Sequence, residues 1–399
     1  MRKISLFMIR ILIVILATPS VGMLYAESPS PGTIHSFEGG TLRRAGAVNV
    51  LSLHGSYRRM GRQYGHLLRR ELHRLYQIAI VNRFINKDGF TYQQLLQTAK
   101  SMFATYPYRY KEILYGMAQT SGLGLDRQLL LNFIEWYPKL NVPGRNCSGM
   151  AVWGEYTGGG PLIFGRNNDD SGLYREFAPF LTVAAFNGDD GAIPAAIINY
   201  AGVIYAASGI NSRGVFLEMN SGDAMGYYSN RLSILVSLFG FLQDFSGIED
   251  MDAAFHSSLV NLSSIINVAD STIAYSYECP TTFPPRRRSP DQDGILVATN
   301  HFVEPDPSWN LPQQKDDETT EWTITRRKNL LARGEEYKGL FDVDRMKEIL
   351  EMTIEEGGAT SASNTIYQII AVPGEMRLWV RAPECFSWQE VNLKEIFQD

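Results

Sequence analysis

Residues 146–170 read NCSGMAVWGEYTGGGPLIFGRNNDD, and this stretch decides the fold. Residues 148–156 alternate small or apolar side chains in a short run typical of a strand. The glycines and proline of residues 157–161 then break the chain, and residues 162–165 are apolar again. The pattern predicts a β-hairpin.

Reactive and charged side chains stand where the two strands of this hairpin begin and end. Cys147 opens the first strand, and Arg166 and Asp169 close the second. A tight reversal would bring a thiol, a guanidinium and a carboxylate to one end of the hairpin. The plainer interpretation of the Arg-x-x-Asp pair is a surface turn with a salt bridge worth under ~1 kcal/mol. Asp169 and Asp170 alone are a poor ligand set, so we predict no metal.

The predicted secondary structure changes at Cys147. Residues 41–140 are predicted to be mainly helical, with helices over 57–83, 92–106 and 110–121 and a fourth capped by Asp126. The first helix has an apolar stripe at helical spacing, which we assign to the core. That stripe comprises Met60, Tyr64, Leu67, Leu68, Leu72, Leu75 and Ile78.

Strands and helices alternate in blocks after Cys147. Strands are predicted over residues 181–186, 195–200, 203–207, 215–219, 265–269, 272–278, 295–299, 365–372 and 377–380, and helices over 232–245, 249–259, 318–333 and 342–355. This order favours an α+β fold with two stacked antiparallel sheets and helices outside, an α/β/β/α sandwich, although other layered arrangements fit the same pattern. Residues 27–40 are predicted to be an unstructured lead, and the proline- and arginine-rich residues 281–294 a solvated loop.

The first 26 residues have the pattern of a secretory signal peptide. Arg2, Lys3 and Arg10 precede a short apolar core, and residues 24–26 resemble a cleavage site. An uncleaved membrane anchor is the alternative, but residues 11–26 are shorter than the ~20 needed to span a bilayer. We therefore expect a periplasmic or secreted protein with no stable membrane insertion after signal removal.

Composition narrows the function classes. The 399 residues are 45% hydrophobic and carry a net charge of -5, which gives no electrostatic case for binding nucleic acid. Three cysteines, Cys147, Cys279 and Cys385, exclude a small disulfide framework and leave at least one thiol unpaired. Cys279 and Cys385 are either core residues or one disulfide.

Cys147 with residues 165–169, GRNND, resembles the cysteine N-terminal-nucleophile (Ntn) hydrolases, which include choloylglycine hydrolases, acid ceramidase relatives and penicillin acyltransferases. The resemblance implies that the cysteine becomes the first residue of the mature catalytic chain. Its α-amino group, with a pKa of ~7.7 to 8.0, then serves as base for its own thiol. Residues 55–65, GSYRRMGRQYG, are also similar to the pro-region of acyltransferase-type members.

The resemblance implies roles for six residues. At the hairpin, Cys147 is the nucleophile, Arg166 favours its thiolate, and Asp169 holds its free amine. Three later segments complete the set: residues 209–221 supply Asn220 as an oxyanion donor, residues 298–302 supply Asn300, and residues 323–326, with Thr in place of Ser, supply Arg326. Without the resemblance, Asn220 would be read as the cap of a strand or turn.

About 120 residues separate the signal from Cys147, as in family members that cut themselves into two associated chains. The implied organisation is a signal peptide over residues 1–26, a helical N-terminal region over 27–146 and a catalytic region over 147–399. The implied activity is hydrolysis of a small linear carboxamide, or acyl transfer from it, without a cofactor. Such a substrate could be an N-acyl amine or amino acid, a penicillin or a bile salt. Aromatic residues near the hairpin could bind an acyl group or belong to the core. These are Tyr174, Phe177, Phe180, Tyr227 and Tyr228.

Two alternatives remain open. Cys147 and His301 have the chain order of a papain-like protease, but the local motif around the cysteine of those enzymes is absent. The second alternative is an exported binding protein that has no catalytic activity.

Overall fold

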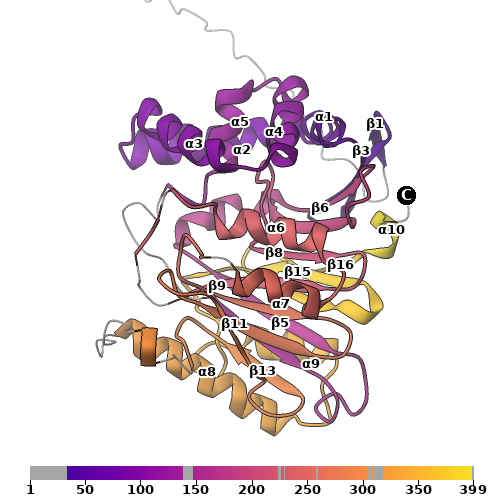
Figure 1. The fold of residues 1–399 in the computed structure, drawn as a ribbon, viewed down its shortest axis with the longest axis vertical. Coiled ribbons are helices and arrows are strands. Elements are labelled where there is room, and N and C mark those ends of the chain that lie inside the picture. The colour runs from indigo at the N-terminus through magenta and orange to yellow at the C-terminus, as the bar shows by residue number, and fades with distance from the viewer. Residues whose placement is uncertain are drawn as a thin grey trace, which may run out of the picture. The chain divides into compact units, whose positions relative to one another are not determined.

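Two β-sheets form the centre of the computed structural model (Figure 1). It describes residues 34–137, 147–222, 226–228, 230–257, 259–303, 307–309 and 318–397. The larger sheet has the strand order β1-β2-β3-β6-β7-β8-β9-β10-β11-β12 and the smaller one β13-β4-β5-β14-β15-β16. Neighbouring strands are antiparallel except β3 and β6, which are parallel. The predicted pair of largely antiparallel sheets is confirmed.

The strands of the larger sheet are β1 (His35–Phe37), β2 (Gly40–Ala45), β3 (Val48–Gly55), β6 (Leu181–Gly188), β7 (Ala195–Tyr200), β8 (Ser208–Asn211), β9 (Phe216–Ser221), β10 (Ser264–Ala269), β11 (Ala274–Cys279) and β12 (Arg286–Arg288). Those of the smaller sheet are β4 (Ser148–Val152), β5 (Ile163–Asp169), β13 (Ile295–Ala298), β14 (Thr365–Val372), β15 (Arg377–Ala382) and β16 (Phe386–Asn392). Strands from before and after Cys147 therefore share the larger sheet.

The predicted hairpin is present as β4 and β5, with Ser148 opposite Asn167. Its connecting loop contains Gly154, Gly158 and Gly159, all with positive φ. Glycine is the residue that adopts this backbone region without a steric penalty, which explains the glycine run in the sequence.

Side chains of the hairpin alternate between two cores, as the pleat of a strand requires. Met150 and Val152 pack with residues of the helices α8 (Glu318–Glu336) and α9 (Val343–Glu351). Ala151 and Phe164 face the larger sheet, where the rings of Phe164 and Phe216 lie 5.1 Å apart. The hairpin is thus buried on both faces, between a helical layer and the second sheet.

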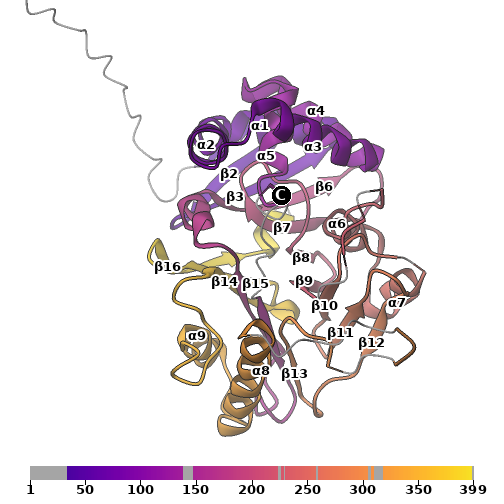
Figure 2. The ribbon, with the colours of Figure 1, turned by 90° about the vertical axis from the view of Figure 1, so that its left-hand side faces the viewer.

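The far face of the larger sheet is covered by α6 (Ile234–Asp244) and α7 (Ile248–His256). Figure 2 shows α8 and α9 on one side of the strands and α6 and α7 on the other. Together with the two sheets, these pairs form the four layers of the expected sandwich. The short helix α10 (Lys394–Phe397) packs against β3 and β6.

The N-terminal helices are α1 (Tyr57–Leu67), α2 (Arg69–Leu75), the π-helix η1 (Tyr76–Lys87), α3 (Tyr92–Thr105), α4 (Tyr108–Ser121) and α5 (Leu125–Asn132). Helices α1 and α4 cross closely where Gly61 has no side chain. A Cβ at this position would stand 2.1 Å from the carbonyl oxygen of Ile113. The single helix predicted over residues 57–83 is wrong in detail, since it is divided into α1, α2 and η1. Asp126 does not cap α5; Gly124 does, and Asp126 pairs with Lys100 at 3.0 Å.

Three further predictions are corrected. Residues 203–207 are not a strand, because the backbone N–H of Ile204 donates to Asn132 and that of Ala206 donates to Leu235 in α6. Strand β1 lies inside the predicted unstructured lead. The predicted solvated loop contains β12, whose Arg288 is buried and donates to the carbonyl oxygen of Val297.

The predicted signal peptide and residues 138–146, which include Asn146, lie outside the described residues. In the part of the chain that is described, no helix has the length and apolar character needed to cross a membrane. The proposed division at residue 146 stays a prediction.

Candidate active site

The thiol of Cys147 lies at the open end of the β4–β5 hairpin. Its Sγ is 3.8 Å from Nη2 of Arg166 and donates to the carbonyl oxygen of Asp169 at 3.5 Å. Only 8% of Cys147 is exposed. The hairpin register therefore brings the three predicted residues together, as the sequence indicated.

Arg166 is fixed by a dense set of acceptors from the larger sheet. Its Nη1 donates to the carbonyl oxygen of Ala207 at 2.5 Å and to Oγ of Ser208, and its Nη2 donates to the carbonyl oxygen of Met219 at 2.7 Å. Its Nε lies 3.1 Å from Oε2 of Glu218. The guanidinium is thus held in place by the larger sheet, with Nη2 toward the sulfur.

Asp169 lies beside the main chain of Cys147. Nη1 of Arg326 donates both to Oδ2 of Asp169 and to the carbonyl oxygen of Cys147, each at 3.2 Å. The hydroxyl of Thr365 donates to Oδ1 of Asp169 at 2.7 Å. Arg326 thus links this carboxylate to the carbonyl oxygen of Cys147.

Arg326 also contacts Asn300, in the predicted segment of residues 298–302. Its Nη2 donates to Oδ1 of Asn300 at 2.7 Å, and Nδ2 of Asn300 donates to the carbonyl oxygen of Ser221 at 2.8 Å. The hydroxyl of Thr323 accepts the backbone N–H of Asn300 at 2.7 Å. The Thr that replaces the expected Ser still supplies a hydroxyl here.

Asn220 is the predicted residue least connected to this network. It is fully buried in β9 opposite Ile265, and its Nδ2 donates to the carbonyl oxygen of Ala298 over a long 3.4 Å. Its neighbour Ser221 lines the cavity at Cys147, whereas Asn220 and Asn300 do not. Both amides donate to main-chain carbonyl oxygens in this structure.

Burial controls the ionisation of the site. It raises the pKa of Cys147, and the charge of Arg166 offsets this only in part. Burial also raises the pKa of Asp169, to about 7, against the opposing effect of Arg326. The thiol of the intact chain is therefore mostly protonated near neutral pH.

Sequence reasoning missed the two buried glutamates Glu218 and Glu135. Glu218 is completely buried and pairs with Arg166, and its pKa is raised by burial. The available signal was Glu218 itself, a single acidic residue inside the apolar run of residues 215–219. Such a residue indicates a buried ion pair, because a carboxylate is rarely buried without a partner. Glu135 carried no local signal.

A small cavity opens at the thiol. Its volume of about 20 Å³ suffices for a single water molecule. Its walls are formed by Glu135, Cys147, Arg166, Asn168, Asp169, Asp170, Ala207, Met219, Ser221 and Leu235. The cavity at Cys147 is therefore too small for an acyl group in this structure.

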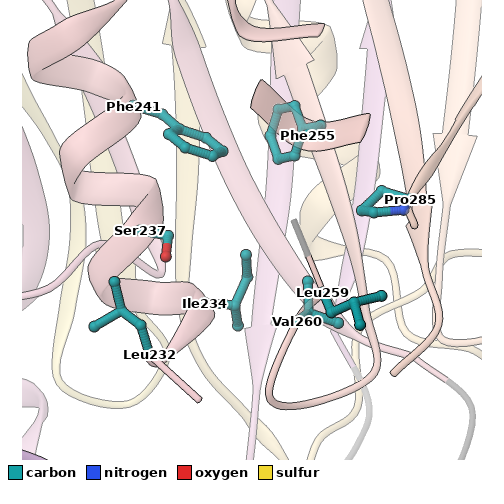
Figure 3. Close-up of a pocket in the computed structure, with 8 residues that line it drawn as sticks. All are labelled: Leu232, Ile234, Ser237, Phe241, Phe255, Leu259, Val260 and Pro285. Carbon is teal, nitrogen blue, oxygen red and sulfur yellow. The ribbon is translucent and has the colours of Figure 1, made fainter. Parts of the chain in front are cut away.

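A larger, apolar cavity of about 240 Å³ lies on the other side of the first turn of α6 (Figure 3). Ile234 faces this cavity, while the next residue, Leu235, lines the cavity at Cys147. Its lining comprises Leu232, Ile234, Ser237, Phe241, Phe255, Leu259, Val260 and Pro285. None of the five aromatic residues considered for acyl binding lines either cavity, and Tyr174, Phe177 and Phe180 belong to the core.

His301 is not placed on the thiol. Its Nδ1 lies 3.1 Å from Oγ1 of Thr323 and 3.3 Å from Oγ1 of Thr299, and burial lowers its pKa to about 4. Cys147, Cys279 and Cys385 are all free thiols, so Cys279 and Cys385 do not form the disulfide that the sequence left open.

No protein-family model and no curated protein sequence matches the chain. Three solved structures align with it over 57–63% of its length. They are a Caenorhabditis elegans ortholog of N-acylethanolamine-hydrolyzing acid amidase (18% identity, 93% of that chain, TM-score 0.43), a variant of conjugated bile acid hydrolase from Clostridium perfringens (13%, 94%, 0.46) and penicillin V acylase from Agrobacterium tumefaciens (10%, 87%, 0.41). All three are members of the Ntn-hydrolase superfamily, which the sequence motifs resemble.

Proposed function

We propose that the protein is a self-activating amidohydrolase in which Cys147 is the nucleophile and, after cleavage of the bond between Asn146 and Cys147, also provides the base. One observation carries this proposal. Arg166 contacts the sulfur of Cys147, while Asp169 is held at its main chain by Arg326. The same residue thus has a group suited to stabilise a thiolate and a group suited to hold a freed ammonium.

Activation would proceed through the cysteine itself. Sγ attacks the carbonyl carbon of Asn146, a carbon–sulfur bond forms, and the carbon–nitrogen bond breaks as the nitrogen takes up the thiol proton. Water then hydrolyses this thioester to give a new carboxylate on Asn146 and a free thiol and amine on Cys147. The raised pKa of the buried thiol and its small cavity support a latent state before this step.

The mature enzyme would repeat this chemistry on its substrate. The free amine takes the thiol proton, Sγ adds to the amide carbonyl, and the leaving amine departs with that proton. Water or an acceptor amine, deprotonated by the same α-amine, then resolves the acyl-cysteine. Asn220 and Asn300 would donate to the oxyanion once their present main-chain partners are exchanged for the substrate.

We also propose export of the chain and continued association of its two pieces. Strands β1 to β3 precede Cys147 and pair into the larger sheet through β3 and β6, which supports association after cleavage. The acyl and amine groups of the substrate are those of a small linear amide.

The test combines intact mass with a nucleophile variant. The purified exported protein should appear as two chains whose masses place the cut before Cys147, and Cys147→Ala should give one uncut chain with no amide hydrolysis. Cys279→Ala is the matched control, because it removes another buried thiol that lies outside this site. A single full-length chain that hydrolyses amides would sink the proposal.

A further inference from the structure

Glu135 is a buried carboxylate that reaches the nucleophile cavity from the N-terminal side of the chain. It follows α5 in a turn, only 7% of it is exposed, and it lines the same cavity as Cys147 and Asp169. The residue belongs to the segment that would become the separate N-terminal chain after cleavage.

No described residue supplies Glu135 with a positive charge. Among the described residues, Nδ2 of Asn199 donates to Oε2 of Glu135 at 3.4 Å, and Tyr205 also interacts with this carboxylate through its side chain. The negative charge of Glu135 instead acts on a tyrosine. It is the second-largest cause, after burial, of the raised pKa of Tyr205. A buried carboxylate without a cation is costly, so the arrangement is suited to an external partner.

Two other charged residues of the cavity are paired within the protein. Arg166 is the one cation among the described residues of the lining, and it pairs with Glu218, while Asp169 pairs with Arg326. Three carboxylates line the cavity against this one guanidinium. A ligand that enters beside the thiol therefore meets a surface with excess negative charge.

We infer that Glu135 determines which leaving amine the enzyme accepts, and that the substrates are amides of neutral or cationic amines rather than of amino acids. The inference rests on the proposed function and sharpens it. A hydroxyl or ammonium group on the leaving amine would hydrogen-bond or pair with Glu135, whereas the carboxylate of an amino-acid conjugate would be repelled. The cavity holds about one water in the uncut chain, so this selection belongs to the processed protein.

Three amides that differ only in charge test the inference. They carry one shared acyl group, decanoyl or phenylacetyl, on 1,2-diaminoethane, ethanolamine or glycine, so that the far end of the amine is cationic, neutral or anionic. For the processed wild-type protein we expect kcat/KM for the cationic and the neutral amide to exceed that for the glycine amide at least tenfold. A wild-type preference for the glycine amide would overturn the inference, whatever the variants do.

The variant Glu135→Gln tests whether Glu135 causes this preference among the three amides. Glutamine keeps the shape and the acceptor for Asn199 but removes the charge, so the ratio of kcat/KM for the cationic to the anionic amide should fall at least fivefold. Glu176→Gln is the matched control at an exposed glutamate and should leave the ratio unchanged. Equal loss of activity on all three amides would show a merely structural role and reject the inference.

Failure of the proposed function is distinguishable from failure of this inference. If processed wild-type protein cleaves none of the amides, the proposed function fails and the inference falls with it. If it cleaves all three without regard to charge, the proposed function stands and only the role of Glu135 is lost. Should Glu135→Gln not be processed, the wild-type series alone decides.

Discussion

Two arginines, Arg166 and Arg326, approach the same cysteine from different layers of the fold. Both side chains are only 1% exposed, and each is paired with a buried carboxylate. Arg166, from β5, contacts the sulfur of Cys147, while Arg326, from α8, contacts its carbonyl oxygen. The difference teaches that the side chain and the main chain of one residue are held by separate charge pairs.

The two counter-ions differ in position as well. Glu218, in β9, pairs with Nε of Arg166, whereas Asp169 shares Nη1 of Arg326 with the carbonyl oxygen of Cys147. Glu218 therefore stabilises an arginine, and Asp169 is placed to act on the cysteine itself. Substitutions that remove one member of each pair should separate these roles.

Arg166→Met should have the largest effect. It leaves Glu218 buried without a cation and removes the charge beside the sulfur, so we expect a loss of about 3–5 kcal/mol of unfolding free energy and of measurable activity. Stability is measured by urea unfolding in the uncut Cys147→Ala background. Adding Glu218→Gln should restore part of the stability but none of the activity, and a stable, active single variant would contradict the assignment.

Arg326→Met should cost less, about 2–3 kcal/mol, since Asp169 can then become neutral by taking up a proton and keeps its hydrogen bond from Thr365. Processing at Cys147 should slow, because the carbonyl oxygen of Cys147 loses a donor. Urea unfolding and the rate of appearance of the two chains measure these effects. A cost equal to that of Arg166→Met would remove the distinction between the two pairs.

The pH dependence of stability should report on Asp169. Its pKa of about 7 in the folded chain exceeds the ordinary value of 3.8, so the folded state binds more protons between these values and stability falls as pH rises from about 4 to about 7. Unfolding free energy measured in the Cys147→Ala background should therefore decline, by up to about 1.4 kcal/mol per pH unit, relative to the same protein carrying Asp169→Asn. Parallel pH profiles would show that Asp169 is ionised throughout.

His301→Asn should have the smallest effect. The histidine is held by Thr299 and Thr323 and its pKa is lowered to about 4, so it is neutral at physiological pH and has no contact with the thiol. We expect kcat/KM of the processed enzyme to change less than about threefold, and the cut to occur normally. A loss of a hundredfold or more would instead favour the papain-like alternative.

Local patterns in the sequence predicted much of this structure. The glycine run between two apolar segments predicted the β4–β5 hairpin, and the hairpin alone places Cys147, Arg166 and Asp169 at one end. The period of two also predicted most later strands. It failed for residues 203–207, which are apolar because they pack in the core but whose backbone bonds go to a side chain and to α6.

The polar positions of the site were less accessible to such reasoning. Asn300 and Arg326 were placed only by resemblance to a family, and their contact, 2.7 Å between Nη2 and Oδ1, joins segments 26 residues apart. Glu218 and Glu135 were missed, because burial of an acid depends on partners that the neighbouring sequence does not name.

The sequence by itself determined the hairpin and the cysteine at its end, because alternation of side chains and glycine turns are local properties of the chain. The tertiary structure alone decided which carboxylate pairs with which arginine, and that Glu135, twelve residues before the cysteine, faces it across a cavity. Charge pairing in a buried site is set by distances between layers, and these distances arise only when the two sheets and their helices pack.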